Sequence, residues 1–228
     1  MAMYQMTDER VDTAELARAW AEGWVISRLA SPPEQTPYGL VFDVGTQSRQ
    51  VTRHVLPAAD EAQVRELTST ITAPGTWLKT LLPREVLAPW MAPGWEFDDP
   101  GFLMSTPLEP VLAPVPDGYR LRAWTRGALT RVLVVTADGT FAARGQVAVP
   151  PDADTAVVDQ VETAADQRRK GLGSLVMRTL ANEAFAAGAR TAVLGATPEG
   201  RALYESLGWR TDAPLTGLIR DPSAAPKV

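Results

Sequence analysis

A short basic stretch with two glycines is the part of the sequence best suited to chemistry. It reads Gln167-Arg168-Arg169-Lys170-Gly171-Leu172-Gly173-Ser174 and joins a run of small and β-branched residues to a run with helical spacing. The first amides of a helix lack intrahelical partners and carry partial positive charge. Because glycine has no Cβ, a phosphate can approach such a backbone closely. The stretch predicts a pyrophosphate cradle, although an ordinary helix start with a solvated basic cluster would have the same letters.

Two other phosphate-binding loops do not fit this stretch. The dinucleotide fingerprint requires a third Gly or Ala at position 176, where the sequence has Val176. A P-loop requires Lys and then Ser or Thr directly after its last glycine, whereas Ser174 and Leu175 follow Gly173. The spacing Arg168-x-x-Gly171-x-Gly173 resembles the acyl-CoA motif of the GNAT superfamily of acyl-CoA-dependent N-acyltransferases.

A second motif strengthens this resemblance. After a short buried strand predicted at 190–196, residues 197–209 read Thr-Pro-Glu-Gly-Arg-Ala-Leu-Tyr-Glu-Ser-Leu-Gly-Trp. The superfamily usually shows Asn-x-x-Ala-x-x-Leu-Tyr-x-x-Leu-Gly-Phe at this place. Thr197 stands where the family has the Asn that orients the cofactor arm, so this contact is left open, and Gly200 replaces the Ala. The resemblance covers about residues 118–220.

The resemblance implies a site that uses acetyl-CoA as cosubstrate and no metal. The implied cofactor-binding residues come from a bulge in the fourth strand, from the cradle and from the second motif: Val161, Glu162, Thr163, Arg168, Arg169, Lys170, Gly171, Leu172, Gly173, Ser174, Thr197 and Tyr204. Tyr204 matches the family's tyrosine that protonates the leaving thiolate. Asp159 and Glu162 are the candidate general bases, on opposite faces if the strand alternates, and Glu162 is favoured.

Composition limits the other functional classes. The 228 residues include no cysteine and one histidine and carry a net charge of −5, which argues against disulfides, thiolate nucleophiles, multi-His metal sites and general nucleic-acid binding. Because no early apolar run has membrane or signal length, we expect no membrane contact and a cytoplasmic location. An acidic protein favours cationic acceptors, which include polyamines, aminoglycosides and lysine side chains. A homodimer is left open.

The predicted fold class is α+β: a GNAT domain at 111–222 with a mixed, largely antiparallel sheet and flanking helices, a smaller α+β domain at 1–110, and a tail at 223–228. Strands are expected at 119–125, 129–137, 141–149 and 157–163, with a hairpin at Asp138-Gly139. The family places two helices between its first two strands, and here there is no room for them. We therefore expect residues 1–110 to replace them and to cover the acceptor side. Whether this part is a degenerate repeat of the same fold stays open.

The N-terminal part has fewer signals. A helix is predicted within 8–30 with Asp12 or Thr13 as its cap, with strand or helix left open after Trp24. A strand pair is expected at 38–44 and 50–56, and a helix at 57–71. The proline-rich residues 74–116 contain aromatic side chains that either fill a core or form a wall for the acceptor, and 108–116 reads as a linker. His54 is expected to be a structural or surface residue rather than a catalytic one.

Together these features predict an N-acetyltransferase that moves an acetyl group from acetyl-CoA to a primary amine of a small molecule or protein by direct attack. The alternative is a non-catalytic acyl-CoA-binding module that acts as a sensor or partner domain.

Overall fold

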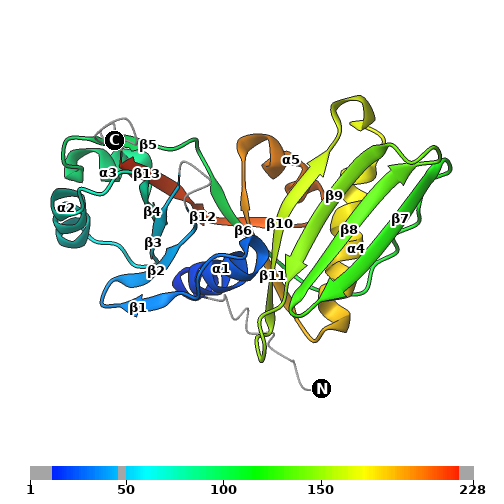
Figure 1. Cartoon of the computed structure of the whole chain (residues 1–228), viewed down its shortest axis with the longest axis horizontal. Helices are drawn as coiled ribbons and strands as arrows, with labels where there is room; N and C mark the ends of the chain where they lie inside the picture. The colour runs from blue at the N-terminus through cyan, green and yellow to red at the C-terminus, as the bar shows by residue number, and fades with distance from the viewer. Residues whose placement is uncertain (1–11, 46–49, 221–228) are drawn as a thin grey trace, which may run out of the picture.

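The computed structural model describes residues 12–45 and 50–220. They form two mixed, largely antiparallel sheets that lie side by side, with helix α1 (Thr13–Arg28) between them (Figure 1). This arrangement confirms the predicted α+β class. The predicted tail at 223–228 lies outside the described residues.

The first sheet contains strands from both ends of the chain. Its order is β1 (Glu34–Thr36), β2 (Gly39–Asp43), β3 (Thr52–Leu56), β4 (Thr76–Thr80), β13 (Thr216–Arg220) and β5 (Trp95–Phe97). All neighbours are antiparallel except β3 and β4, which are joined by helix α2 (Glu61–Thr70). The short helices α3 (Arg84–Leu87) and η1 (Ala88–Trp90) follow β4.

The second sheet has the order β12 (Arg210–Pro214), β6 (Phe102–Pro107), β11 (Thr191–Ala196), β10 (Thr155–Thr163), β9 (Phe141–Ala148), β8 (Leu129–Thr136) and β7 (Tyr119–Arg126). Its parallel pair is β10 and β11, joined by η2 (Ala165–Gln167) and α4 (Leu172–Ala186). Helix α5 (Pro198–Ser206) connects β11 to β12. The four strands predicted between residues 119 and 163 are all present.

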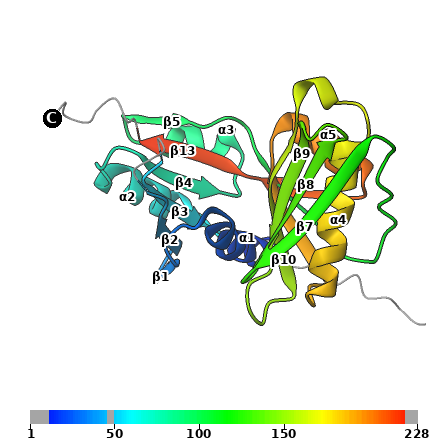
Figure 2. The same ribbon diagram turned by 45° about the vertical axis from the view of Figure 1, so that its right-hand side comes forward.

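The two sheets repeat one topology and exchange a strand. In each sheet a parallel strand–helix–strand unit is followed by an antiparallel strand and then by an edge strand. The antiparallel strand comes from the other half of the chain in both cases: β6 joins the second sheet (Figure 1), and β13 joins the first (Figure 2). The described part of the N-terminal half is therefore a repeat of the C-terminal topology, which the sequence left open.

The exchange moves the division between the halves away from residue 110. β6 precedes that residue and yet pairs with β11, while β13 lies within the predicted domain 111–222 and pairs with β4. Strand exchange depends on long-range pairing, which local sequence patterns do not record. The predicted linker follows β6 and is held against α4, because the Asn182 side chain accepts a hydrogen bond from the Val111 amide and donates one to its carbonyl.

Helix α1 packs on both sheets and forms the core between them. Asp12 caps it, and the helix continues to Arg28, so the alternative left open after Trp24 resolves to helix. Its apolar side chains share one cluster with Leu40, Phe42 and Val55 of the first sheet and with Val157 and Val193 of the second. A Cβ at Gly23 would lie 2.2 Å from a Val157 methyl group, so a glycine is required for this close approach.

Most aromatic residues of the proline-rich segment pack in or against the hydrophobic cores. Trp95 is buried, with Trp90 and Phe97 packed against the cluster beneath α2, and Met104 lies in the cluster beneath α4. His54 is buried on β3, and its Nδ1 lies 3.1 Å from the Tyr38 hydroxyl, as expected for a structural histidine. Core packing thus accounts for Trp90, Trp95, Phe97 and Met104.

The faces of the second sheet are covered unequally. Helix α4 packs on one face, over β8, β9 and β10. Helix α1 covers the opposite face over β9, β10 and β11. In the described ranges no helix packs on that opposite face over β7 and β8, which stay open to solvent (Figure 1).

Candidate active site

The parallel strands β10 and β11 separate before β10 ends. They pair only from Thr155 opposite Thr191 to Val157 opposite Val193, although β10 continues to Thr163. A groove of about 940 Å³ occupies the space beyond the last pair. It runs from the start of α4, along the end of β10, to α5.

The start of α4 supplies free amides to this groove. Gly171 is the N-cap with φ 79°, and no side chain caps the helix. The first intrahelical bond runs from the Leu175 amide to the Gly171 carbonyl, so the amides of residues 172–174 have no partner within the helix. These amides, the helix dipole and the neighbouring arginines provide a site for an anion. This geometry fits the predicted pyrophosphate cradle.

The groove brings together nearly all the site residues predicted from the sequence. Those that line it are Asp159, Val161, Glu162, Thr163, Arg168, Arg169, Gly171, Leu172, Gly173, Ser174, Thr197 and Tyr204. Lys170 is the exception, since its ammonium donates to the Gln167 side chain at 3.0 Å. Gly173 also packs on α5, because a Cβ there would lie 3.0 Å from a Leu203 methyl group.

A bulge in β10 places its two acidic side chains on one face. The pairing with β9 shifts between Asp159 and Glu162, and Gln160 has φ 53°. Asp159 stands opposite Gln146, and Glu162 stands opposite Arg144, which comes two residues before Gln146 in β9. Directly opposite residues point to the same side of a sheet, so both acids face away from α4. The prediction of opposite faces was wrong, because the bulge inserts a residue and resets the alternation.

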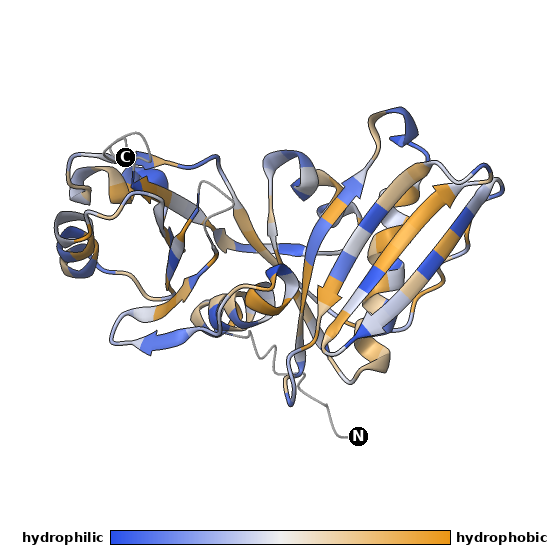
Figure 3. Cartoon of the chain, in the orientation of Figure 1, coloured by the Kyte–Doolittle hydropathy of each residue, from blue (hydrophilic) through white to orange (hydrophobic). Residues whose placement is uncertain are grey.

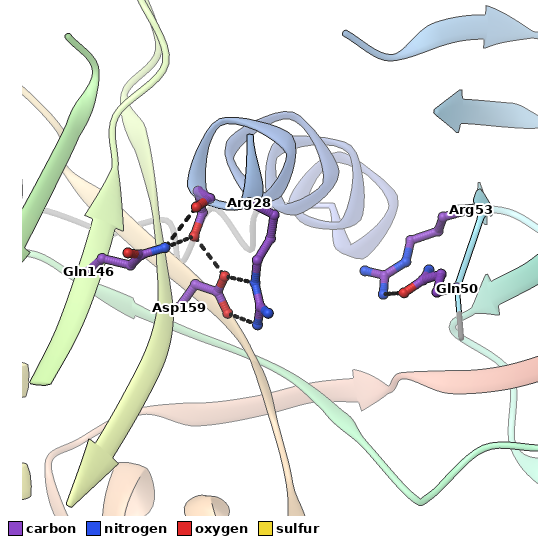
Figure 4. A network of polar contacts seen from close by, with 6 residues as sticks. Arg28, Gln50, Arg53, Gln146 and Asp159 are labelled. Atoms are coloured by element: carbon purple, nitrogen blue, oxygen red, sulfur yellow. Dashed lines mark hydrogen bonds and ion pairs between the residues drawn. The ribbon is translucent and has the colours of Figure 1, made fainter. Parts of the chain in front are cut away.

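Asp159 is fully engaged by α1. It accepts hydrogen bonds from the Ser27 hydroxyl at 2.6 Å and from Arg28 Nε and Nη2 at 2.5 and 2.8 Å (Figure 4). The Gln146 amide in turn donates to the Ser27 hydroxyl and carbonyl. Both oxygens of Asp159 are occupied, so protonation of this carboxylate would disrupt the ion pair.

Glu162 is more available to accept a proton. Its side chain is 51% exposed, and Arg144 contacts Oε2 alone, at 2.8 Å. Oε1 has no hydrogen-bond partner among the described residues. Of the two candidate bases, Glu162 is therefore the one with an oxygen open to water.

Tyr204 lies at the α5 side of the groove in an apolar setting. Its ring packs near Trp209, with centroids 6.0 Å apart, and the residue is 9% exposed. Burial, with a contribution from the negative charge of Asp159, raises the pKa of Tyr204 to about 12. The hydroxyl therefore stays protonated at neutral pH, and no hydrogen bond from it is found within the described part of the chain.

The two departures in the second motif have local roles. The Thr197 hydroxyl caps α5 by accepting from the Gly200 amide at 3.1 Å, which leaves its own proton free to donate. A Cβ at Gly200 would lie 3.0 Å from the Tyr204 ring, so glycine leaves room for this aromatic side chain.

Comparison with known proteins identifies this half of the chain. The model of the acetyltransferase (GNAT) family matches residues 101–209. The C-terminal half is a GNAT domain. Among curated proteins, no relative of the chain was found.

Solved structures show the same fold over nearly the whole chain. A GCN5-related N-acetyltransferase from Kribbella flavida has a TM-score of 0.66 and 21% identity, covering 91% of this chain and 95% of its own. A GCN5-related N-acetyltransferase-like protein from Streptococcus suis has a TM-score of 0.56 and 14% identity, and the match covers 91% of this chain and 99% of that protein. A tandem GNAT protein from the clavulanic acid biosynthesis pathway has a TM-score of 0.53 and 15% identity, covering 85% and 82%.

The N-terminal repeat differs from the GNAT domain at the equivalent place. β3 and β4 stay paired over five residues each, with no separation at their ends. Asp60 caps α2 by accepting from the Gln63 amide, and Glu61 follows in the first turn. Two carboxylates at this helix start disfavour an anion, whereas the start of α4 has no acidic residue in its first turn.

Sequence reasoning missed several residues of the groove. Arg28 and Gln160 line it, as do Gly195 and Leu203. Leu203 lay within a recognised motif, but Arg28 comes from a helix far earlier in the chain, and nothing in its local pattern indicates the contact. Within the described ranges, no helix has the length and apolar character to span a bilayer. In the same residues no three His, Cys, Asp or Glu side chains gather as metal ligands.

Proposed function

We propose that the GNAT domain transfers an acetyl group from acetyl-CoA to a primary amine by direct attack. The observation that carries this proposal is one continuous groove that joins the free amides of α4 to the buried Tyr204 past the β10 bulge. Acetyl-CoA, when bound, supplies an acetyl group activated as a thioester. The α4 amides with Arg168 and Arg169 suit its pyrophosphate, and the backbone of residues 161–163 suits its amide-containing arm.

Each proton in the reaction has a candidate carrier. Glu162, through a water molecule, accepts the proton that the ammonium of the acceptor must lose. The amine nitrogen then bonds to the thioester carbonyl carbon as the carbon–sulfur bond breaks. Tyr204 donates its proton to the departing sulfur and regains one from the nitrogen through solvent. The high pKa of Tyr204 suits a donor that must remain protonated before each turnover.

The proposal is tested by two measurements on the full chain. Calorimetric titration should show CoA binding, and free thiol should appear when acetyl-CoA is mixed with an acceptable amine. Binding without thiol release for any amine would favour the non-catalytic acyl-CoA module. Absence of CoA binding would refute both readings.

A further inference from the structure

The open face of the second sheet carries a row of arginines. The register places Arg122 beside Leu133 and then Arg144, and Trp124 beside Arg131 and then Gln146, across β7, β8 and β9. Residues paired in this way point to the same side. A Cβ built on Gly145 would point at Val176 and Leu180 of α4. Because alternate residues of a strand point to opposite faces, the neighbouring Arg144 and Gln146 face away from α4. Figure 3 shows hydrophilic and hydrophobic segments alternating along these strands.

Five arginines share this basic face, which we define as Arg120, Arg122, Arg126, Arg131 and Arg144. Arg144 is paired with Glu162. For the other four, no carboxylate lies within ion-pair distance in the described part of the chain. An unneutralised cluster on a protein of net charge −5 sets up a local field opposite to that of the whole molecule.

Protection of a sheet edge explains only part of this cluster. Charged side chains on β7, an edge strand, would discourage pairing with another chain. Arg131 lies on β8, inside the sheet, where no edge needs protection. Trp124, which is 45% exposed, is an apolar side chain that such protection would disfavour.

A pocket of about 370 Å³ connects this face to the groove. Its lining includes Arg28, Trp124, Arg131, Arg144, Gln146 and Gln160. Arg28 and Gln160 also line the groove, so the two spaces meet at the β10 bulge. Arg28 is neutralised by Asp159 and Arg144 by Glu162, which leaves the charge of Arg131 uncompensated within the pocket.

We propose that the acceptor is an amine that also carries a carboxylate or a phosphate, with its anionic group held by Arg131 and its body beside Trp124. This inference rests on the proposed function and names its substrate class. A guanidinium matches either anion with two parallel hydrogen bonds. An acceptor anchored in this way has its amine directed to the bulge, where Glu162 and the end of the groove lie. The pocket thus selects against the polycationic acceptors that the net charge alone favours.

Matched pairs of acceptors test the proposal. Thiol release is measured for phosphoethanolamine against ethanolamine, and for each amino acid against its carboxamide, at constant ionic strength. The acidic member should have a kcat/KM at least about tenfold higher, the factor that one ion pair of about 1.4 kcal/mol provides. The phosphate and carboxylate arms show which anion is used. Equal or better use of the neutral members would overturn the proposal.

Two arginine variants test whether Arg131 itself binds the anionic group of the acceptor. Arg131→Gln should raise KM for the acidic acceptor about tenfold with kcat nearly unchanged, and leave the neutral acceptor and the acetyl-CoA KM unaffected. Arg120→Gln removes the same charge from the same face outside the pocket and should change neither. Equal losses in both variants, with tight binding of an RNA oligonucleotide to the wild type, would identify a polyanion surface instead and refute the pocket.

The proposal can also be tested if no acceptor amine gives thiol release. CoA binding measured by calorimetry reports on the proposed function independently of any acceptor. If CoA binds but no amine reacts, the acidic amines are titrated into the CoA complex. Binding that is lost in Arg131→Gln and kept in Arg120→Gln supports the acidic acceptor, and no binding at millimolar concentration overturns it.

Discussion

Arg28 and Asp159 are 131 residues apart in the sequence and form a two-point ion pair, with Nε–Oδ2 at 2.5 Å and Nη2–Oδ1 at 2.8 Å. The pair joins the last turn of α1 to the strand whose bulge lines the groove. Ser27 adds a hydroxyl donor to the same carboxylate. The N-terminal half is thereby tied to the GNAT domain beside the proposed reaction site.

A double-mutant cycle should detect this tie. Arg28→Met and Asp159→Asn are combined, and the free energy of unfolding is measured in urea. We expect a coupling of about 1 kcal/mol, reduced from that of a buried pair because the Arg28 side chain is 39% exposed. The Arg65–Glu61 pair on α2, with both side chains more than half exposed, is the control and should give no more than about 0.5 kcal/mol. Equal coupling free energies would show that the Arg28–Asp159 pair stabilises the fold no more than an exposed ion pair does.

His54 should make stability depend on pH. Burial lowers the pKa of His54 to about 4 from its ordinary value of 6.5. Between these two values the unfolded chain binds a proton that the folded chain does not, so the free energy of unfolding falls as the pH drops from 6.5 to about 4. The loss attributable to His54 is on the order of 3 kcal/mol at most.

Urea unfolding of the wild type and of His54→Gln across this pH range checks the effect. His54→Gln keeps the carboxylates that titrate in this range and lacks the imidazole. Its free energy of unfolding should therefore change less with pH than that of the wild type. Parallel curves would mean that the histidine is protonated in the folded state.

Local chemistry was readable from the sequence, whereas long-range pairing was not. The helix start at Gly171 and the turn at Asp138-Gly139 depend on neighbouring residues, and the structure has both. The exchange of β6 and β13 and the contact of Arg28 with Asp159 depend on residues more than eighty positions apart. The bulge at Gln160 was expected from the family resemblance, but its effect on side-chain direction required the register with β9.

The close packing of α1 on β10 at Gly23 can be tested by substitution. In Gly23→Ala the new methyl group overlaps Val157, and overpacking of this kind costs about 1–3 kcal/mol. The better helix propensity of alanine returns at most about 1 kcal/mol. We therefore expect a net loss of stability in a urea titration. Combination with Val157→Ala should cost less than the sum of the two single changes, since the second makes room for the first. Glu22→Ala, on the exposed side of α1, measures helix propensity alone; a stabilised Gly23→Ala would contradict the close packing.

The cradle can be tested by charge at constant size. Ser174→Glu places a carboxylate in the first turn of α4, where it stabilises the helix dipole but repels a pyrophosphate. Ser174→Gln has nearly the same volume without the charge. Calorimetry should show CoA affinity lower in the Glu variant than in the Gln variant by about tenfold or more, with the melting temperature of the Glu variant equal or higher. Equal affinities would place the pyrophosphate elsewhere.

Tyr204→Phe separates chemistry from packing. The ring contacts with Trp209 persist, and no hydrogen bond of the hydroxyl is lost within the described residues, so stability should change by no more than about 0.5 kcal/mol. If Tyr204 protonates the departing sulfur, kcat should fall by a factor of about 10² to 10⁴ while CoA affinity stays the same.

Trp209→Phe is the matched control for Tyr204→Phe, because it disturbs the same packing and leaves the hydroxyl in place. It should lose about 1–3 kcal/mol of stability and keep most of its turnover. Turnover near normal in Tyr204→Phe would remove the tyrosine from the reaction. A slow Tyr204→Phe that binds CoA and melts normally, beside a destabilised Trp209→Phe that still turns over, can be explained only by a hydroxyl that acts in the chemical step.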